Sequence, residues 1–404
     1  MTKISKPKIH YFNPGHEAAI HSGSAHYTPT ATVRKMMTDL ALLPLWYSDA
    51  GDYVWVDNIV DAFGFISTIP HEIRPQACPI SLAEMPELYA NIISLEAAPW
   101  GISPQSIHFF ETLRSHLPLL SIPQWNETLV CLTSRCTAID CLLELSSLTN
   151  VMPPQIFTNL NDIQKFMETC PLPCIIKTPF SCSGKGLRWI YSRKWDEPTR
   201  RWISGALKKQ QSVSIETALD KVCDFAMEFE ADGDGHVIFK GLSVFNTSAD
   251  GAYNGNVLAG KILLEKYLTD FVSAGDLDKV REVVRTVLEK RIGTTYKGLL
   301  GVDMLIYRQN ASFHIHPFIE LNLRRTMGHI SLQLGKRLVH PSAQGRFIIS
   351  CQQASEAYRT HLQMTKKHPL QIDGGKIRSG YFSLCPVAAG TKYRAYVEIN
   401  SETK

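Results

Sequence analysis

Hydrophobic and polar positions alternate most regularly in the second half of the chain. Residues 224–230 alternate large apolar side chains with acidic or small ones, which is the pattern of a half-buried strand. Asp232-Gly-Asp-Gly235 follows, and Asp-Gly is a typical hairpin turn, so residues 236–245 should form the return strand. A calcium loop would need a bidentate glutamate further on, and none stands at that spacing. A β-hairpin is therefore predicted.

Shorter segments predict strands and helices in alternation. Expected strands cover residues 8–12, 53–57, 174–178, 187–192 and 213–217 (the last one exposed), with two more at 380–384 and 393–399. Expected helices cover residues 134–145, 161–169, 198–210 and 276–291. Asn161 is a suitable N-cap for the second helix. Residues 65–105 contain six prolines, which predicts a loop-rich stretch. The chain is expected to belong to the α/β class.

Composition restricts the classes of function. A chain of 404 residues should contain two or three compact units, since single cores seldom exceed about 250–300 residues. The net charge of +4 comes from 42 basic and 38 acidic residues that are scattered along the chain, so no nucleic-acid surface is expected. The ten cysteines include no C-x-x-C pair, which favours buried thiols in a reducing compartment.

Neither a signal peptide nor a membrane span is expected. The N-terminal residues lack the apolar core of a signal peptide. No segment approaches the ~18 consecutive apolar residues of a spanning helix. The sequence thus predicts a cytoplasmic protein.

A lysine and a loop of small residues suggest a site for phosphate. Lys177 ends a predicted strand, and Phe180-Ser-Cys-Ser-Gly-Lys-Gly186 follows. Gly184 and Gly186 allow the close backbone approach that lets N–H groups converge on phosphate oxygens, and Lys177 adds a point charge. The spacing is not that of a Walker A motif, and a strand follows the loop where that motif has a helix. An ordinary hairpin loop would have a similar pattern.

Two later strands carry acidic residues on one face. If residues 309–312 are a turn, Asp303 lies opposite Phe318 and Glu320 is its diagonal neighbour at roughly 7–8 Å. Asn322 shares that face, whereas the opposite faces are apolar. Mg²⁺ prefers one or two carboxylates together with substrate phosphates, so these residues are candidate ligands. A solvated sheet face is the alternative, which the adjacent Arg324-Arg325 pair disfavours because cations there suit phosphoryl transfer.

Two histidine groups are further candidates. His314 and His316 share a strand face, but no other residue at suitable spacing completes a zinc site. Asn13-Pro-Gly-His-Glu17 follows the first predicted strand, and α/β folds often bind ligands at such a strand end. This segment belongs to a denser N-terminal set that comprises His10, His16, Glu17, His21 and His26. A purely structural role for these histidines is the alternative.

Together, the lysine strand and the acidic strands resemble the ATP-grasp superfamily, over residues 126–340. Ile175-Ile-Lys-Thr-Pro179 with Ser183-Gly-Lys-Gly186 resembles the lysine strand and glycine loop of the family. Val213-Ser-Ile-Glu-Thr-Ala-Leu219 resembles its interlobe hinge. Gly301-Val-Asp303 and Ile319-Glu-Leu-Asn-Leu-Arg324 resemble its two metal-binding strands.

This resemblance implies a role for each matching residue. Lys177 would contact the α and β phosphates, and Arg324 would steady the transferring phosphoryl group. Arg135 stands where the family usually has an earlier lysine. The implied nucleotide-binding residues also include Ser183, Gly184, Lys185, Gly186, Glu216 and Leu219. The implied magnesium ligands are Asp303, Glu320 and Asn322.

The resemblance also predicts the domains and the activity. A small α/β domain (1–125) would precede the small lobe (126–215) and the large lobe (216–345) of an ATP-grasp fold, which clasp the nucleotide, and a C-terminal extension (346–404) would pack on the large lobe. The implied cofactors are ATP and Mg²⁺, with Mn²⁺ as a substitute. The implied activity is that of a ligase acting on a small-molecule carboxylate and an amine or other nucleophile. A small-molecule kinase and a nucleotide-binding regulatory protein are the alternatives.

Overall fold

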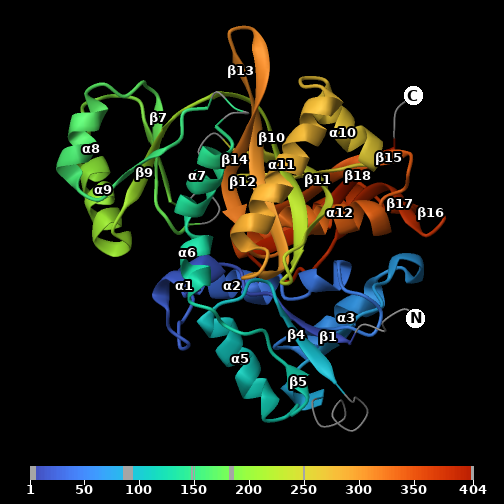
Figure 1. Cartoon of the computed structure of the whole chain (residues 1–404). Helices are drawn as coiled ribbons and strands as arrows, with labels where there is room; N and C mark the ends of the chain where they lie inside the picture. Colours follow the sequence, from blue (N-terminus) through green and yellow to red (C-terminus); the bar gives the residue numbers. More distant parts are fainter. Residues whose placement is uncertain are drawn as a thin grey trace. The chain divides into compact units, whose positions relative to one another are not determined.

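The structure, a computed structural model, describes residues 6–84, 94–146, 149, 151–181, 186–248 and 251–401 (Figure 1). The chain divides into two compact units. Unit 1 comprises Met1–Trp125, Asn254–Leu264 and Arg324–Lys404, and unit 2 comprises Asn126–Tyr253 and Glu265–Leu323. The C-terminal residues therefore cluster in the same unit as the N-terminal residues.

Unit 1 contains a parallel sheet of five strands in the order β3-β2-β1-β4-β5. Strand β1 lies between β2 and β4, so the strands that follow it are added first on one side of β1 and then on the other. The carboxyl end of β1 is therefore a topological switch point. The strands are β1 (Lys8–Tyr11), β2 (Tyr53–Trp55), β3 (Cys78–Ile80), β4 (Leu95–Pro99) and β5 (Leu120–Ser121). The helices of this part are α1 (His16–Ser22), α2 (Ala31–Asp39), η1 (Leu43–Trp46), α3 (Ile59–Thr68), η2 (His71–Ile73), η3 (Leu82–Glu84) and α5 (Pro104–Arg114).

The remaining segments of unit 1 contribute antiparallel strands in the order β12-β15-β18-β17-β16. These strands are β12 (Tyr253–Leu258, whose first residue is assigned to unit 2), β15 (Ala343–Cys351), β16 (Gln371–Asp373), β17 (Lys376–Ser383) and β18 (Tyr393–Ser401). The two predicted C-terminal strands correspond to β17 and β18. The accompanying helices are α10 (Lys261–Thr269, which crosses the unit boundary), α12 (Met327–Arg337) and α13 (Ala354–Lys367).

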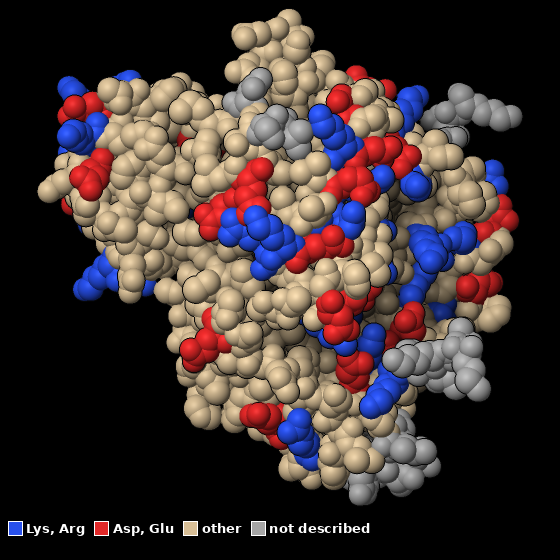
Figure 2. Space-filling view, viewed as in Figure 1, with Lys and Arg blue, Asp and Glu red and all other residues tan. Residues whose placement is uncertain are grey.

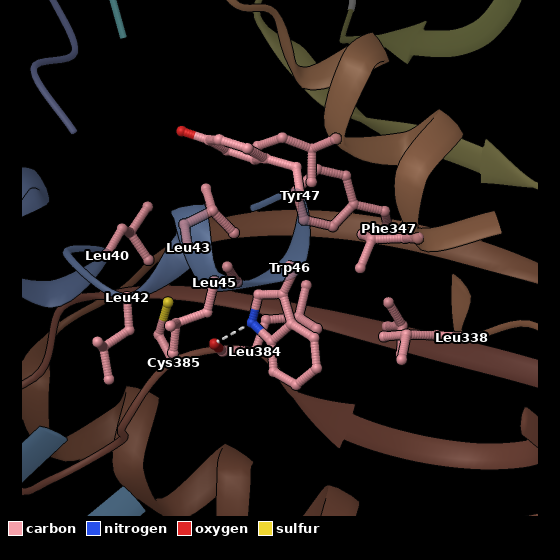
Figure 3. Packing of buried hydrophobic residues seen from close by; sticks show 14 of the residues in the cluster. Leu40, Leu42, Leu43, Leu45, Trp46, Tyr47, Leu338, Phe347, Leu384 and Cys385 are labelled. Carbon is pink, nitrogen blue, oxygen red and sulfur yellow. Dashed lines mark hydrogen bonds between the residues drawn. The ribbon is translucent and has the colours of Figure 1, made fainter. Parts of the chain in front are cut away.

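The main core of unit 1 joins residues that are far apart in the sequence. Helix η1 inserts Leu43, Leu45 and Trp46 among apolar residues of the C-terminal segments, such as Phe347 (Figure 3). The Trp46 indole N–H donates a hydrogen bond of 2.6 Å to the Leu384 carbonyl, since a buried indole needs an acceptor. This shared core explains why residues 324–404 form one unit with the N-terminal part.

Unit 2 contains an antiparallel sheet of four strands in the order β6-β9-β7-β8. Its elements are β6 (Gln155–Phe157), α8 (Leu160–Met167), β7 (Cys174–Lys177), β8 (Leu187–Ile190), α9 (Glu197–Gln210) and β9 (Val213–Thr217). The predicted exposure of β9 is wrong, because β6 and β7 flank it and its first three residues are buried. The predicted N-cap is also wrong. Asn159, not Asn161, caps α8, since its side chain accepts a hydrogen bond from the Asp162 amide.

The longest strands of unit 2 lie in the order β14-β13-β10-β11. The elements here are α6 (Thr128–Thr133), α7 (Arg135–Glu144), β10 (Asp220–Asp232), β11 (Val237–Thr247), α11 (Ala274–Ile292), β13 (Lys297–Gln309) and β14 (Ser312–Asn322). Strands β10 and β11 form the predicted hairpin. The prediction of a half-buried β10 is wrong for Glu228, which is 1 % exposed and accepts a hydrogen bond from Ser243.

The register of β13 and β14 differs from the prediction. Near the turn the pairing is as expected, with Leu305 opposite His316. The register then shifts between Leu305 and Asp303, so that Asp303 lies directly opposite Glu320 and not opposite Phe318. The two extra residues in β14 include Pro317, which has no N–H to donate to a ladder, and such a position suits a bulge. A shift of two residues preserves the face of each side chain, so the acidic residues still share a face.

Basic and acidic side chains are mixed on the surface, and the described helices are unlike membrane spans. Figure 2 shows that Lys and Arg side chains lie among Asp and Glu side chains on the face in view. Over the part of the chain that the structure describes, every helix is too short or too polar to cross a membrane.

Candidate nucleotide and metal site

Lys177 and Glu216 form an ion pair on one face of the four-stranded sheet of unit 2. Ile175 lies opposite Glu216 in the register of β7 and β9, so Lys177 is the diagonal neighbour of Glu216 on that face. The Lys177 ammonium contacts Glu216 Oε1 directly, and Lys177 is only 4 % exposed. The alternate residues Ile176 and Ile215 point into the apolar core of this sheet. The alternation of side chains along β7 and β9 thus directs apolar residues to one face and the charged pair to the other.

His316 of β14 lies near this ion pair. The charges of Glu216 and Lys177 both act on its imidazole, which is 4 % exposed. Burial is the main influence and lowers the pKa of His316 to about 4; Glu216 opposes this effect and Lys177 adds to it. The Nδ1 atom accepts a hydrogen bond of 3.4 Å from the Phe318 amide. His316 is therefore a neutral imidazole that carries its proton on Nε2.

The sequence reasoning considered His316 only as a zinc ligand. Within the described residues, no group of three or more His, Cys, Asp or Glu side chains could hold a metal ion, so the structure gives no support to a zinc site there. The signal that could have placed His316 near the nucleotide site is its position in β14. It lies an even number of residues before Glu320 and Asn322, on the same strand.

Arg135 connects helix α7 to both the lysine strand and the acidic strands. Its Nε donates to the Thr178 carbonyl at 3.2 Å, and its Nη2 donates to Ser181 Oγ at 3.0 Å. The same Nη2 lies 3.2 Å from Glu320 Oε1. With 8 % of its surface exposed, Arg135 is a buried cation beside the candidate phosphate loop.

The loop after β7 is described only at its two ends. The predicted residues Ser183, Gly184 and Lys185 lie outside the described residues. Gly186 is described, and its carbonyl accepts a hydrogen bond from the Thr178 amide. A Cβ atom at Gly186 would lie 2.3 Å from side-chain atoms of Thr178 and Ser181. Glycine is needed at 186 because these neighbouring residues pack directly on its backbone.

The predicted metal ligands lie together on β13 and β14. Asp303 is directly opposite Glu320, and the Asn322 side chain donates a hydrogen bond of 3.1 Å to Asp303 Oδ2. Asn322 is buried, whereas Asp303 and Glu320 are half-buried. Two carboxylates and an amide oxygen are a donor set that suits Mg²⁺ when phosphate oxygens complete the coordination.

Leu219 and Arg324 are the remaining predicted residues. Leu219 is half-buried in the link between β9 and β10, where its carbonyl accepts a hydrogen bond from Lys221. Arg324 begins the last segment of unit 1, and its Nε lies 2.6 Å from Glu17 Oε1 in the same unit. The contact between Glu17 and Arg324 was not predicted from the sequence, because no local pattern relates positions 17 and 324.

The comparisons with known proteins rest on structure. No protein-family model matches the sequence, and a search of curated proteins finds no matching relative. A biotin carboxylase from Campylobacter jejuni superposes with a TM-score of 0.51 at 12% identity, covering 98% of this chain and 88% of its own. For an N5-carboxyaminoimidazole synthetase from Staphylococcus aureus the values are 0.50 and 13%, with coverage of 100% and 95%.

A third solved structure is similar to the same extent. The biotin carboxylase domain of the Hydrogenobacter thermophilus 2-oxoglutarate carboxylase has a TM-score of 0.50 at 12% identity, covering 98% of this chain and 86% of its own. At such low identity these likenesses establish the fold and not the activity. They agree with the resemblance in the sequence, and the chain has the ATP-grasp fold.

Proposed function

We propose that this protein is an ATP-dependent ligase that activates a small-molecule carboxylate as an acylphosphate, which an amine or another nucleophile then opens. The observation that carries the proposal is the arrangement in unit 2. There, buried Lys177 forms an ion pair with Glu216, and Asp303 lies opposite Glu320; this arrangement supports the roles that the ATP-grasp resemblance implies for these residues. The S. aureus neighbour was solved with ADP, and the H. thermophilus one with MgADP and bicarbonate. These ligands support ATP as the nucleotide of this chain.

Each residue has a proposed role that its surroundings support. Lys177 exchanges its contact with Glu216 for the α and β phosphates, and Glu216 and Leu219 then hold the nucleoside. Arg135 remains beside the phosphate loop, to which Ser183, Gly184, Lys185 and Gly186 contribute. In the expected division, residues 126–215 supply the phosphate-binding lobe and residues 216–345 supply the metal lobe.

Asp303, Glu320 and Asn322 would hold Mg²⁺, with Mn²⁺ as a substitute. The bound cation would supply charge neutralisation between phosphate oxygens. The protein itself binds, orients and shields the reactants, which accounts for most of the catalysis in phosphoryl transfer. Arg324 is proposed to steady the transferring phosphoryl group. No side chain needs to form a covalent bond with the substrate.

We also propose a cytoplasmic location. All the described cysteines are free thiols, which agrees with a reducing compartment. The proposed partners are a carboxylate and a nucleophile, without nucleic acid or membrane.

The test is a product analysis with ATP·Mg²⁺. Bicarbonate is the first carboxylate to supply, because a structural neighbour binds it, and pooled carboxylate metabolites follow. The ligase should release ADP and free phosphate, and hydroxylamine should trap an acyl hydroxamate when the acceptor is an organic acid. Arg324→Lys should lose most of this activity, because an ammonium cannot reproduce the planar fork of a guanidinium. A stable phosphorylated product without free phosphate would refute the ligase and identify a kinase.

A further inference from the structure

The segment Asn13-Pro-Gly-His-Glu17 follows the carboxyl end of β1 in unit 1 and contacts Arg324 through Glu17. Helix α1 begins at His16 after Gly15, whose φ of 80° favours glycine. His16 and Glu17 are 2 % and 6 % exposed. A buried carboxylate at a helix start needs a partner, and the partner of Glu17 comes from a distant part of the sequence of unit 1.

Glu17 contacts Arg324 on one side and His16 on the other. Arg324 Nε lies 2.6 Å from Glu17 Oε1, and His16 Nδ1 lies 3.2 Å from Glu17 Oε2. Burial acts to raise the pKa of Glu17, but Arg324 and His16 outweigh it and hold this pKa below its usual range. Glu17 is therefore a permanent anion beside the guanidinium of Arg324.

A second contact fixes the same guanidinium from its other side. Arg324 Nη1 donates to the Arg325 carbonyl at 3.2 Å. The Arg325 amide in turn donates to the Trp100 carbonyl at 3.0 Å, just beyond the end of β4. The backbone that carries Arg324 is thus attached to the parallel sheet, and the guanidinium is fixed through both Nε and Nη1.

The His16 ring is itself held in place. A Cβ atom at Gly101 would lie 2.5 Å from the ring, so the Gly101 backbone packs directly against the imidazole. Asn13 holds Gly101 by two hydrogen bonds, from Asn13 Nδ2 to the Gly101 carbonyl at 2.8 Å and from the Gly101 amide to Asn13 Oδ1 at 3.3 Å. These contacts fix the position of the ring, although both of its nitrogens are buried without a hydrogen-bond partner among the described residues.

We propose that Glu17, supported by His16, is a positioning residue that fixes the orientation in which the Arg324 guanidinium meets an anionic substrate group. The inference rests on the proposed function for the role of Arg324. A free arginine side chain loses rotamer freedom when it binds a ligand, and a carboxylate that fixes it beforehand removes that entropic cost from the binding of substrate. Glu17 acts through Arg324 and does not itself touch the substrate.

The chain contains a matched control for this arrangement. His71 and Glu72 are the same dipeptide, with the same contact between Nδ1 and Oε2, at 3.3 Å. Their side chains are 86% and 47% exposed, and the structure shows no arginine paired with Glu72 among the described residues. Glu72→Gln therefore removes the same type of charge without affecting Arg324.

The first measurement needs no substrate. Phenylglyoxal modifies accessible arginines, and peptide mapping by mass spectrometry gives the rate at Arg324 in the full-length protein. Glu17→Gln should raise this rate at least fivefold, Glu17→Asp should raise it less, and Glu72→Gln should leave it unchanged. An unchanged rate in a folded Glu17→Gln protein overturns the inference. If that variant does not fold, an unchanged rate in Glu17→Asp overturns it equally.

The second measurement separates positioning from stability. With ATP·Mg²⁺ and bicarbonate, Glu17→Gln should lower kcat/KM for bicarbonate about tenfold or more, and Glu17→Asp should recover part of the loss. The Kd of ATP·Mg²⁺ should stay within twofold of the wild-type value, because Arg324 is proposed to act on the phosphoryl group only during its transfer, whereas the residues proposed to bind the nucleotide beforehand belong to unit 2. An equal loss of ATP affinity would show that Glu17 is structural. If the wild-type protein does not bind ATP·Mg²⁺, the proposed function fails, while the phenylglyoxal rates still decide whether Glu17 holds Arg324.

Discussion

His316 should remain neutral far below the pH at which an ordinary histidine becomes charged. Its pKa falls from the usual 6.5 to about 4, chiefly because burial excludes water from the imidazole. Since one pKa unit corresponds to about 1.4 kcal/mol, protonating His316 in the folded protein costs about 3 kcal/mol more than in the unfolded chain. The folded state binds fewer protons, so this contribution to stability is complete above pH 6.5 and is lost as the pH falls toward 4.

Two substitutions should move this pKa in opposite directions. Lys177→Met removes a cation, so the pKa of His316 should rise. Glu216→Gln removes an anion that favours the protonated imidazole, so the pKa should fall further. Each change should be a fraction of the total, because the charges contribute less than burial does.

The assay is an NMR titration of the protein labelled with ¹³C at histidine Cε1. Loss of one resonance in His316→Gln assigns the signal. A His316 signal that titrates near pH 6.5, or that moves in the same direction in both variants, would refute the burial of His316 beside Lys177 and Glu216.

Three further predictions concern the candidate site. ATP·Mg²⁺ at 100 times its Kd should stabilise the protein by about 2.7 kcal/mol, so an unchanged Tm at millimolar ATP·Mg²⁺ would contradict nucleotide binding. Asp303→Asn and Glu320→Gln should keep the circular dichroism spectrum and Tm close to wild type but abolish ADP release, because the cation neutralises phosphate charge; unfolding of both variants would indicate structural residues. Arg135→Lys should lower the free energy of unfolding, measured in urea titrations, by about 2 kcal/mol, because hydrogen bonds of a charged donor contribute about 1.5–3 kcal/mol each. An ammonium cannot reach Thr178, Ser181 and Glu320 together. A variant as stable as the wild type would contradict the observed contacts.

The sequence by itself determined several of the local elements and the faces on which Lys177 and the acidic candidate residues lie. Alternation in β7, β9, β13 and β14 requires that Lys177 and the acidic residues lie opposite the apolar side chains, and this follows from the period of two in any strand. A shift of two residues in the register of β14 did not alter the faces. For this reason the two carboxylates were correctly expected to lie together, although Asp303 was expected opposite Phe318 and lies opposite Glu320.

The tertiary structure decided what no local pattern could contain. The burial of β9 and of Glu228 depends on strands and helices that cover them from elsewhere in unit 2. The neutral state of His316 depends chiefly on its burial, and the contact of Glu17 with Arg324 joins residues separated by 307 positions. Periodicity records only which face of its own element a side chain occupies, whereas partners across the fold are selected by packing and by the need to satisfy buried charge.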